Sequence, residues 1–302
     1  MPGMISGRAR PRLSRSVRVA TRFTLTAALL AGGVAAAVPS QAAANPFERG
    51  PAPTQAGLER PGPFQVGQLQ AQNALPGFAA GRIYYPTDTT QGTFGAVAIV
   101  PGFVSSWESI QWIGPRLASH GFVVIGIDTL TPTDIPADRG NQVLAALDNL
   151  LNDRRVNSRI DRSRTALAGW SMGGGGVLEA ARNRPGLKAI VPWAPWDIEK
   201  NFSGVRVPTL IIGDEFDELA PVDEHAIPFY NTVSTPSKAY ANLNNTDHFF
   251  VWNDNPIQSR LTVSWLKRYV DNDTRYSQFL CPGPAVDPAF GLVQDYRARC
   301  PL

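Results

Sequence analysis

The chain has 302 residues, of which 18% are charged, and its 28 basic and 25 acidic residues give a formal net charge of +3. Six of the basic residues are arginines within the first 44 positions, where no acidic residue occurs, so the rest of the chain carries 22 basic and 25 acidic residues. Such a slightly acidic body lacks the positive surface that attracts nucleic acid, which argues against that class of partner.

The first 44 residues have the composition of a secretory signal peptide. Arginines spread over residues 8–22 precede a mostly apolar run over residues 23–38, and the small residues 42–44 follow. This order of charge, apolar run and small-residue cleavage site is typical of exported proteins. The apolar run is shorter than the roughly 20 residues that a membrane-spanning helix needs. We expect cleavage near Ala44, secretion out of the cell or into the periplasm, and no membrane span afterwards.

Residues 45–302 are long enough to bury the core of a single domain, and no long linker divides them. Residues 45–75 are rich in Pro, Gly and Gln and predict an irregular lead-in. Apolar runs typical of buried strands follow at residues 81–85, 95–100, 122–127, 165–169, 187–191, 209–212 and 238–243. Segments with helical periodicity lie between or after them, at residues 112–119, 140–152, 172–183 and 263–270. The alternation predicts an α/β fold with a mainly parallel sheet and helices on both faces.

The segment Gly169-Trp170-Ser171-Met172-Gly173 fits the pattern G-x-S-x-G. It stands between a predicted strand and a predicted helix, which is the context that a nucleophile elbow requires. The glycines permit a strained turn, and the free N–H groups at the helix start favour developing negative charge. We therefore expect Ser171 to be the nucleophile of an α/β-hydrolase fold. A glycine-rich turn with an ordinary serine is the simpler alternative.

A serine hydroxyl needs a base to take its proton, and in this fold the acid and then the histidine follow the serine along the chain. His248 lies in a polar loop after the strand at residues 238–243, where the fold places its base. His120 precedes Ser171, and His225 lies in an apparently helical segment, so both are expected to be surface or packing histidines.

Four acidic residues crowd the loop after the strand at residues 209–212, where the orienting carboxylate belongs: Asp214, Glu215, Asp217 and Glu218. We favour Asp217 because an apolar turn follows it directly, and Asp214 is the alternative. The carboxylate would hold the tautomer of His248 and stabilise its imidazolium form.

Two backbone amides must stabilise the oxyanion, and Met172, directly after the nucleophile, is expected to supply one. The other is expected from Phe103, in the loop after the strand at residues 95–100. Trp193 and Trp196 follow the strand after the nucleophile helix. We expect Trp193 to pack in the core and Trp196 to lie beside the cleft, where it could stack on substrate.

The two cysteines, Cys281 and Cys300, are both near the C-terminus. In an exported protein such a pair indicates one disulfide, and no histidine lies between them to suggest a metal site.

Several long motifs together resemble bacterial cutinases and, more broadly, polyester hydrolases that degrade poly(ethylene terephthalate). They are GWSMGGGG, PGFVSSWESIQWIGPRLASHGFVVIGIDT, APWD, EFDELAPV, the loop histidine and the C-terminal cysteine pair, and the likeness runs from about Asn45 to Leu302. The resemblance implies Ser171, Asp217 and His248 as the triad and Phe103 and Met172 as the oxyanion donors. It also implies Trp196 as the mobile aromatic residue of the cleft, the Cys281–Cys300 bridge and an apolar residue, Leu219, facing that aromatic.

Two departures from the family pattern are visible. Phe103 stands where many members have tyrosine, and two cysteines cannot supply the second disulfide of the mesophilic plastic-degrading type. Family members can be stabilised by Ca²⁺, but this sequence shows no defined oxygen cage, so no metal ligand is assigned.

We therefore expect a secreted, monomeric serine esterase that acts on cutin, aliphatic polyesters or poly(ethylene terephthalate) and on short acyl esters, without a cofactor. No long insertion occurs between Pro192 and Pro208, where many lipases carry a lid. Two alternatives remain: a small-ester carboxylesterase or lipase with the same triad, and a non-catalytic module that binds polymer through its aromatic residues.

Overall fold

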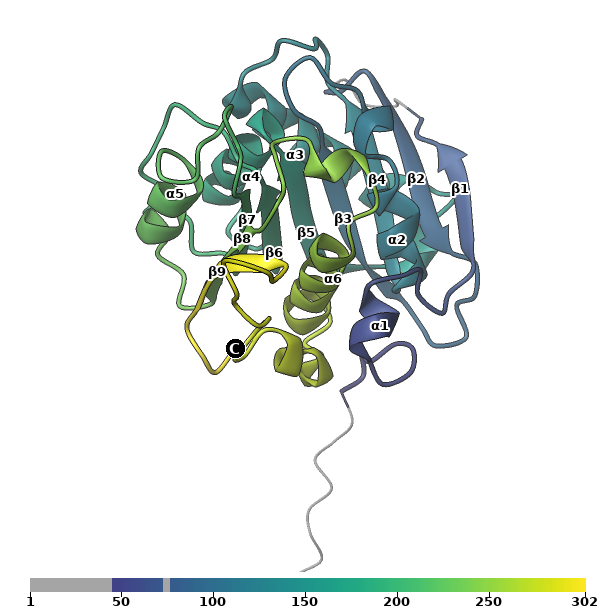
Figure 1. Cartoon of the computed structure of the whole chain (residues 1–302). Helices are drawn as coiled ribbons and strands as arrows, with labels where there is room; N and C mark the ends of the chain where they lie inside the picture. Colours follow the sequence, from purple (N-terminus) through teal and green to yellow (C-terminus); the bar gives the residue numbers. More distant parts are fainter. Residues whose placement is uncertain (1–44, 73–76) are drawn as a thin grey trace, which may run out of the picture. The chain divides into compact units, whose positions relative to one another are not determined.

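The computed structural model describes residues 45–72 and 77–302 (Figure 1). The predicted signal peptide lies outside the described residues. Within them, nine strands form one sheet in the order β1-β2-β4-β3-β5-β6-β7-β8-β9. The strands are β1 (Val66–Gln70), β2 (Ala80–Pro86), β3 (Phe94–Val100), β4 (Phe122–Asp128), β5 (Ile160–Trp170), β6 (Ala189–Trp193), β7 (Thr209–Asp214), β8 (Lys238–Leu243) and β9 (Val293–Ala298).

The central strands, from β4 through β3 to β8, pair in parallel, whereas β1, β2 and β9 join by antiparallel pairing. All seven expected strands are present, and the prediction of a mainly parallel sheet in an α/β fold is confirmed. The irregular lead-in expected over residues 45–75 is partly wrong, because it contains a short helix, α1 (Gln55–Leu58), and the edge strand β1.

Helices cover both faces of the sheet (Figure 1). One core cluster joins α2 (Ile113–Ser119) and α6 (Pro256–Val270) to one face. The other cluster joins α3 (Pro136–Asn152), α4 (Met172–Asn183) and α5 (Ala226–Thr232) to the opposite face. Four 3₁₀ turns complete the described elements: η1 (Trp107–Ile110), η2 (Asn157–Arg159), η3 (Phe250–Trp252) and η4 (Thr274–Phe279).

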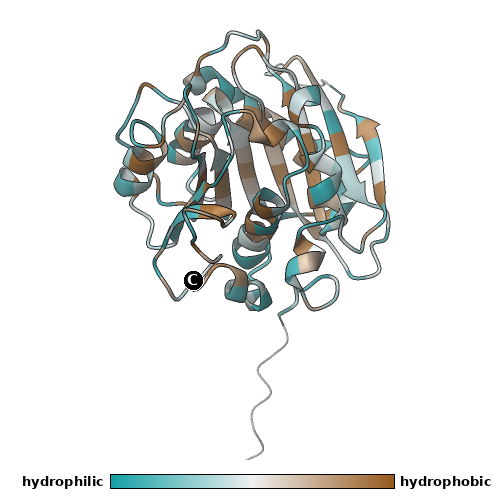
Figure 2. Ribbon diagram, in the orientation of Figure 1, coloured by the Kyte–Doolittle hydropathy of each residue, from teal (hydrophilic) through white to brown (hydrophobic). Residues whose placement is uncertain are grey.

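The two-sided cover explains the composition of the central strands. All seven residues of β3 and all six of β7 and of β8 are buried, and β3 and β7 are apolar along most of their length. Figure 2 shows the apolar residues concentrated in the central strands. The edge strand β1 instead alternates half-buried and exposed residues. Among the described residues, no helix is both long and apolar enough to span a membrane.

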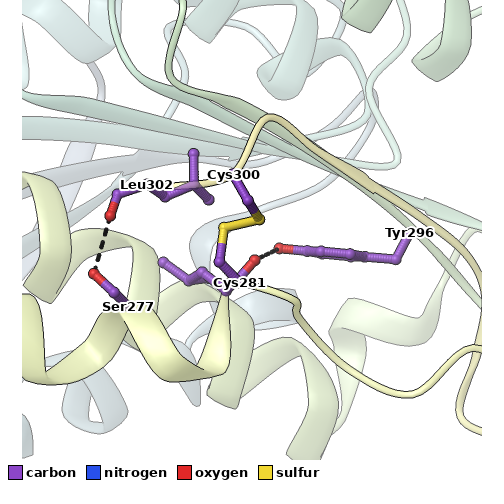
Figure 3. Close-up of a disulfide and its surroundings, with 6 residues drawn as sticks. Ser277, Cys281, Tyr296, Cys300 and Leu302 are labelled. Atoms are coloured by element: carbon purple, nitrogen blue, oxygen red, sulfur yellow. Dashed lines mark hydrogen bonds between the residues drawn. A yellow bond between two sulfur atoms is a disulfide. The ribbon is translucent and has the colours of Figure 1, made fainter.

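The expected disulfide is present between Cys281 and Cys300, whose Cα atoms are 5.7 Å apart (Figure 3). It ties the segment after η4 to the segment after β9. Beside it, the Tyr296 hydroxyl donates to the Leu280 carbonyl at 2.7 Å and the Ser277 hydroxyl donates to the Leu302 carbonyl at 3.1 Å. The bridge closes a loop of about 19 residues, which on a chain-entropy account stabilises the fold by about 3 kcal/mol.

Candidate active site

Ser171 lies in a tight turn between the end of β5 and the start of α4. Its backbone angles, φ 57° and ψ −124°, fall in a region that residues with a side chain rarely adopt. The flanking glycines are required sterically. A Cβ on Gly169 would lie 2.4 Å from the Gly173 carbonyl oxygen, and one on Gly173 would lie 2.5 Å from the carbonyl oxygens of Val100 and Pro101. The predicted strand, turn and helix are therefore all present around the serine.

The three predicted triad residues are joined by hydrogen bonds. The Ser171 Oγ lies 2.9 Å from Nε2 of His248, and Nδ1 of His248 lies 2.8 Å from Oδ2 of Asp217. Ser171 follows β5, Asp217 follows β7 and His248 follows β8, so all three lie beyond the carboxyl ends of parallel strands. The three residues are 5–7% exposed, and the Asp217 side chain is only 1% exposed, so the acid is shielded from solvent.

The Asp217 carboxylate is oriented by its own loop. Its Oδ1 accepts hydrogen bonds from the backbone amides of Leu219 at 3.0 Å and Ala220 at 2.7 Å, which leaves Oδ2 for His248. These bonds fix the direction in which the carboxylate faces the imidazole ring. The apolar turn that favoured Asp217 in the sequence is thus the turn that supplies its amide donors.

Asp214, the alternative acid, does not contact His248. It is fully buried at the end of β7, and Oδ1 lies 2.9 Å from the Thr246 hydroxyl, whereas Oδ2 has no hydrogen-bond partner. Burial raises the pKa of Asp214 well above its usual value. The Thr246 hydroxyl also lies 3.0 Å from the Leu243 carbonyl, so a protonated Asp214 can donate to Thr246 while Thr246 donates to Leu243.

The other two histidines are buried, and their ring nitrogens bond to groups other than Ser171. His120 ends α2 and its Nε2 lies 3.0 Å from the Arg60 carbonyl oxygen; burial lowers its pKa to about 4. His225 precedes α5 and so lies outside the helix in which it was expected, and burial lowers its pKa to about 4 as well. Both environments favour the neutral ring.

The two expected oxyanion donors lie next to the serine. Met172 begins α4, and Phe103 follows Gly102, where a Cβ would lie 2.8 Å from the Cβ of Ser171. Within residues 45–72 and 77–302, neither the Met172 nor the Phe103 amide donates a backbone hydrogen bond. Both amides are therefore free to bind a substrate oxygen.

Trp196 is half-buried beside the nucleophile, and Trp193 is fully buried, as expected. The backbone amide of Trp196 donates to the Ser171 carbonyl at 2.9 Å, and its indole stacks on His225 at 5.7 Å with an interplanar angle of 29°. His225 is held in turn by the Lys200 ammonium, 2.8 Å from Nδ1. Trp196 therefore lies against a packed surface on one side and is partly open on the other.

Two features near the site were not predicted from the sequence: a hydrogen bond made by Trp170 and the buried carboxylate of Asp197. The indole N–H of Trp170 donates to the His248 carbonyl at 2.8 Å and so supports the loop of the base. Asp197, directly after Trp196, is 5% exposed; its Oδ2 has no partner, and burial raises its pKa to about 6. The only sequence signal for Asp197 was its position in the APWD motif.

Large apolar side chains are exposed around the site. Phe103 is 48% exposed, Leu219 56%, Phe249 38% and Trp252 47%. Phe103 and Leu219 belong to the loops of the oxyanion donor and of the acid, whereas Phe249 and Trp252 follow the base. The described part of the chain contains no group of three or more His, Cys, Asp or Glu residues arranged to hold a metal ion.

The sequence is similar to those of several known proteins. The family model described as PET hydrolase-like matches residues 41–301. The chain is 53% identical over 300 residues to Cutinase cut1 of Thermobifida fusca, covering 97% of this chain and 93% of that protein. It is 54% identical over 264 residues to Cutinase 2 of Thermobifida cellulosilytica, covering 86% of this chain and all of that protein. It is also 48% identical over 300 residues to the bis(hydroxyethyl) terephthalate hydrolase of Streptomyces coelicolor, covering 98% and 96% of the two chains.

Proposed function

Because the chain belongs to the PET hydrolase-like family, we propose that it is a secreted serine esterase that hydrolyses the ester bonds of polyesters through Ser171. The observation that carries the proposal is the continuous hydrogen-bond chain from Ser171 through His248 to Asp217 beyond the carboxyl ends of the sheet. This arrangement has the order and contacts that nucleophilic acyl transfer requires.

In the first half of the reaction, the Ser171 oxygen attacks the ester carbonyl carbon while His248 Nε2 takes the hydroxyl proton. The carbonyl oxygen becomes negatively charged and is stabilised by the amides of Phe103 and Met172. When the intermediate collapses, the bond to the alcohol oxygen breaks and His248 returns the proton to that oxygen. The products are the free alcohol and an acyl group bound to Ser171.

In the second half, His248 takes a proton from a water molecule, which attacks the acyl carbon. Collapse of this intermediate returns the proton to the Ser171 oxygen and releases the carboxylic acid. Asp217 accepts the Nδ1–H bond throughout and stabilises the imidazolium without being protonated. The reaction needs no electron transfer and no group beyond the chain's own residues, so we propose that no cofactor is required.

The proposed substrate class follows from the family and from the rim of the site. The relatives are named as cutinases and as a bis(hydroxyethyl) terephthalate hydrolase, which supports cutin, aliphatic polyesters and terephthalate esters as substrates. The exposed side chains of Phe103, Leu219 and Trp252 form an apolar rim suited to a polymer chain. We propose that a monomer acts at the polymer surface after export, as the arginine-rich N-terminal segment and the disulfide suggest.

Active-site labelling and product analysis test this proposal. A fluorophosphonate probe should label the wild-type chain at Ser171 and leave Ser171→Ala unlabelled, because only an activated serine reacts. Chromatography of the solution above films of an aliphatic polyester and of poly(ethylene terephthalate) should show soluble acids and alcohols with the wild type alone.

The two alternatives give other results. A non-catalytic binding module would adhere to the films but leave Ser171 unlabelled. A small-ester carboxylesterase would be labelled and would cleave p-nitrophenyl butyrate, but it would release nothing from either film.

A further inference from the structure

Arg139, near the start of α3, is a fully buried cation outside the catalytic triad. In the part of the chain that the structure describes, its guanidinium donates four hydrogen bonds, and all four end on uncharged oxygen atoms. The Asp134 carboxylate nearby accepts from Thr131 and Gln142 instead. Burial lowers the pKa of Arg139 to about 10, so the group is still charged at neutral pH. Because a buried charge costs free energy, the groups that it binds should explain its presence.

The two terminal nitrogens of the Arg139 guanidinium hold both sides of the loop that carries Phe103. Nη1 donates to the Pro101 carbonyl at 3.1 Å, two residues before Phe103. Nη2 donates to the Pro132 carbonyl at 2.7 Å. That carbonyl also accepts the amide of Val104, directly after Phe103, at 2.7 Å. One planar group therefore fixes the chain on either side of the expected oxyanion donor.

The backbone of Val104 requires such support. Its φ of 52° lies in a region that a β-branched residue rarely adopts. The residue is 62% exposed, so packing of its side chain contributes little to holding it there. A strained backbone persists only where its surroundings fix it. The hydrogen bond to Pro132 fixes Val104, and Arg139 in turn holds Pro132.

On its other side, the Phe103 loop lies against the nucleophile turn. A Cβ on Gly173 would lie 2.5 Å from the Pro101 carbonyl oxygen, and one on Gly102 would lie 2.8 Å from the Cβ of Ser171. A shift of Pro101 would therefore move the Phe103 amide relative to an oxyanion formed at Ser171. Oxyanion donors act at about 2.7–3.1 Å, and a displacement of about 1 Å can lower the rate about 100-fold.

We propose that Arg139 is a positioning residue for the oxyanion hole, whose guanidinium holds the Phe103 amide at the distance that the transition state requires. It does not touch the substrate, because it acts through the carbonyls of Pro101 and Pro132. Lysine is a poor substitute, since its ammonium lacks the planar fork that binds two acceptors in fixed directions. The proposal rests on the proposed ester hydrolysis at Ser171.

Arg139→Lys tests the proposal because it keeps the positive charge and removes the fork. We expect kcat and kcat/KM for p-nitrophenyl butyrate to fall together by about 30-fold, because the weakened contact acts in the transition state alone. KM should stay within about twofold of the wild type. A role confined to folding would lower the Tm without this division between kcat and KM.

The transition-state analogue 1,1,1-trifluoroheptan-2-one supplies a second readout. The Ser171 oxygen bonds to its carbonyl carbon, the hydroxyl proton passes to His248, and the resulting oxyanion faces the amides of Phe103 and Met172. The Ki of this ketone should rise about 30-fold in Arg139→Lys, in step with the loss of kcat/KM. Heptan-2-one keeps the chain but does not form the adduct, so its Ki should stay within about twofold.

Arg164→Lys is the matched control. Arg164 is also buried, but it donates to the Thr93 carbonyl at 2.8 Å, before β3 and at the opposite end of that strand from Pro101. The variant should lower the Tm and leave kcat and both Ki values within about twofold of the wild type. Equal losses of kcat in Arg139→Lys and Arg164→Lys would overturn the proposal, as would wild-type kcat and ketone binding in Arg139→Lys.

Val104→Pro reaches the same contacts from the surface and keeps the test decisive should Arg139→Lys not fold. Proline has no amide to donate to Pro132 and cannot adopt a φ of 52°. We expect kcat to fall and the Ki of the trifluoroketone to rise, each about tenfold, whereas wild-type values would contradict the proposal. Failure of the wild type to hydrolyse p-nitrophenyl butyrate would instead overturn the proposed function.

Discussion

The nucleophile turn and the two loops that carry the acid and the base are held in place by different forces. Around Ser171, carbonyl groups and glycines are packed so closely that a single added Cβ at Gly173 meets two backbone oxygens at 2.5 Å. The loops of Asp217 and His248 are instead joined to each other by hydrogen bonds. The Glu215 amide donates to the Leu243 carbonyl at 3.0 Å, and the Phe216 amide donates to the Thr246 carbonyl at 2.9 Å.

This difference indicates which parts of the site tolerate substitutions. A turn fixed by steric contact has no alternative packing, so its sequence tolerates little change. Loops fixed by polar contacts can lose one bond and keep the others, so changes there should reduce activity in steps. Four predictions test the contrast, in order of decreasing effect.

The largest effect is expected at the acid. Asp217→Asn should lower kcat by about 10⁴-fold, because the amide no longer holds the required tautomer of the base. Thermal stability should change little, since a side-chain oxygen can still accept from Leu219 and Ala220. Asp214→Asn should keep kcat within about threefold of the wild type, because burial already favours the neutral side chain there. Steady-state kinetics on p-nitrophenyl butyrate measures both, and the opposite ranking would make Asp214 the acid.

A substitution in the nucleophile turn should reduce the stability of the fold. Gly173→Ala forces a Cβ against the carbonyl oxygens of Val100 and Pro101, so we expect the free energy of unfolding to fall by about 3 kcal/mol, together with most of the activity. Gly186→Ala is the matched control, because a Cβ there meets nothing within 4 Å. Urea unfolding compares the two variants. Equal stability of both would contradict the steric account of the turn.

A smaller effect is expected between the two loops. Thr246→Val keeps the shape of the side chain but removes the hydroxyl that links Asp214 to Leu243. The free energy of unfolding should fall by about 2 kcal/mol because the buried Asp214 loses its partner. We expect kcat to fall roughly fivefold as the base loop shifts. Thr246→Ser should recover both quantities, and a variant with wild-type kcat and stability would show that the hydroxyl does not join the loops.

The smallest effect concerns the segment after Trp196. Asp197 titrates near 3.8 when unfolded and near 6 in the folded protein, so the folded state holds the proton more tightly in this window. Stability therefore falls as the pH rises from about 4 to 6. Asp197→Asn removes this cost, and its Tm should exceed that of the wild type by about 2–4 °C above pH 6 and match it below pH 4.

Thermal scans across this pH range test the prediction for Asp197. Asp223→Asn makes the same chemical change at an exposed position and serves as the control. A constant offset between Asp197→Asn and the wild type at every pH would argue against titration of Asp197 as the cause.

The sequence allowed the central sheet and the contacts of the triad to be predicted because both depend on local patterns. The strand residues 95–100 and 209–212 are apolar because helices cover both faces of the sheet. The turn around Ser171 carries the G-x-S-x-G motif, which between a strand and a helix is typical of few other structures. The edge strands β1 and β9 were not predicted because they are only partly buried and therefore carry more polar residues. In β1 the half-exposed sequence VGQLQ has the polarity of a loop.

The remaining features arise from tertiary contacts that no local pattern encodes. Residue type alone would place Trp252 in the core, but the packing of η3 on Trp170 leaves it 47% exposed. Asp214 was predicted to lie in the loop as the alternative acid, although it is the last residue of a fully buried strand. The stacking of Trp196 on His225 joins residues that are separated in the chain by the strand β7.

The C-terminal bridge has a consequence for where the chain can mature. β9 pairs with β8 along the border of the sheet, and without it the backbone groups of a fully buried strand would be open to pairing with another chain. The Cys281–Cys300 disulfide keeps β9 close to β8 and so favours their pairing. In a reducing compartment the disulfide does not form, and only backbone hydrogen bonds hold β9 against β8. Production in a reducing cytosol should therefore yield more aggregated protein than production with export, even though the catalytic residues lie elsewhere.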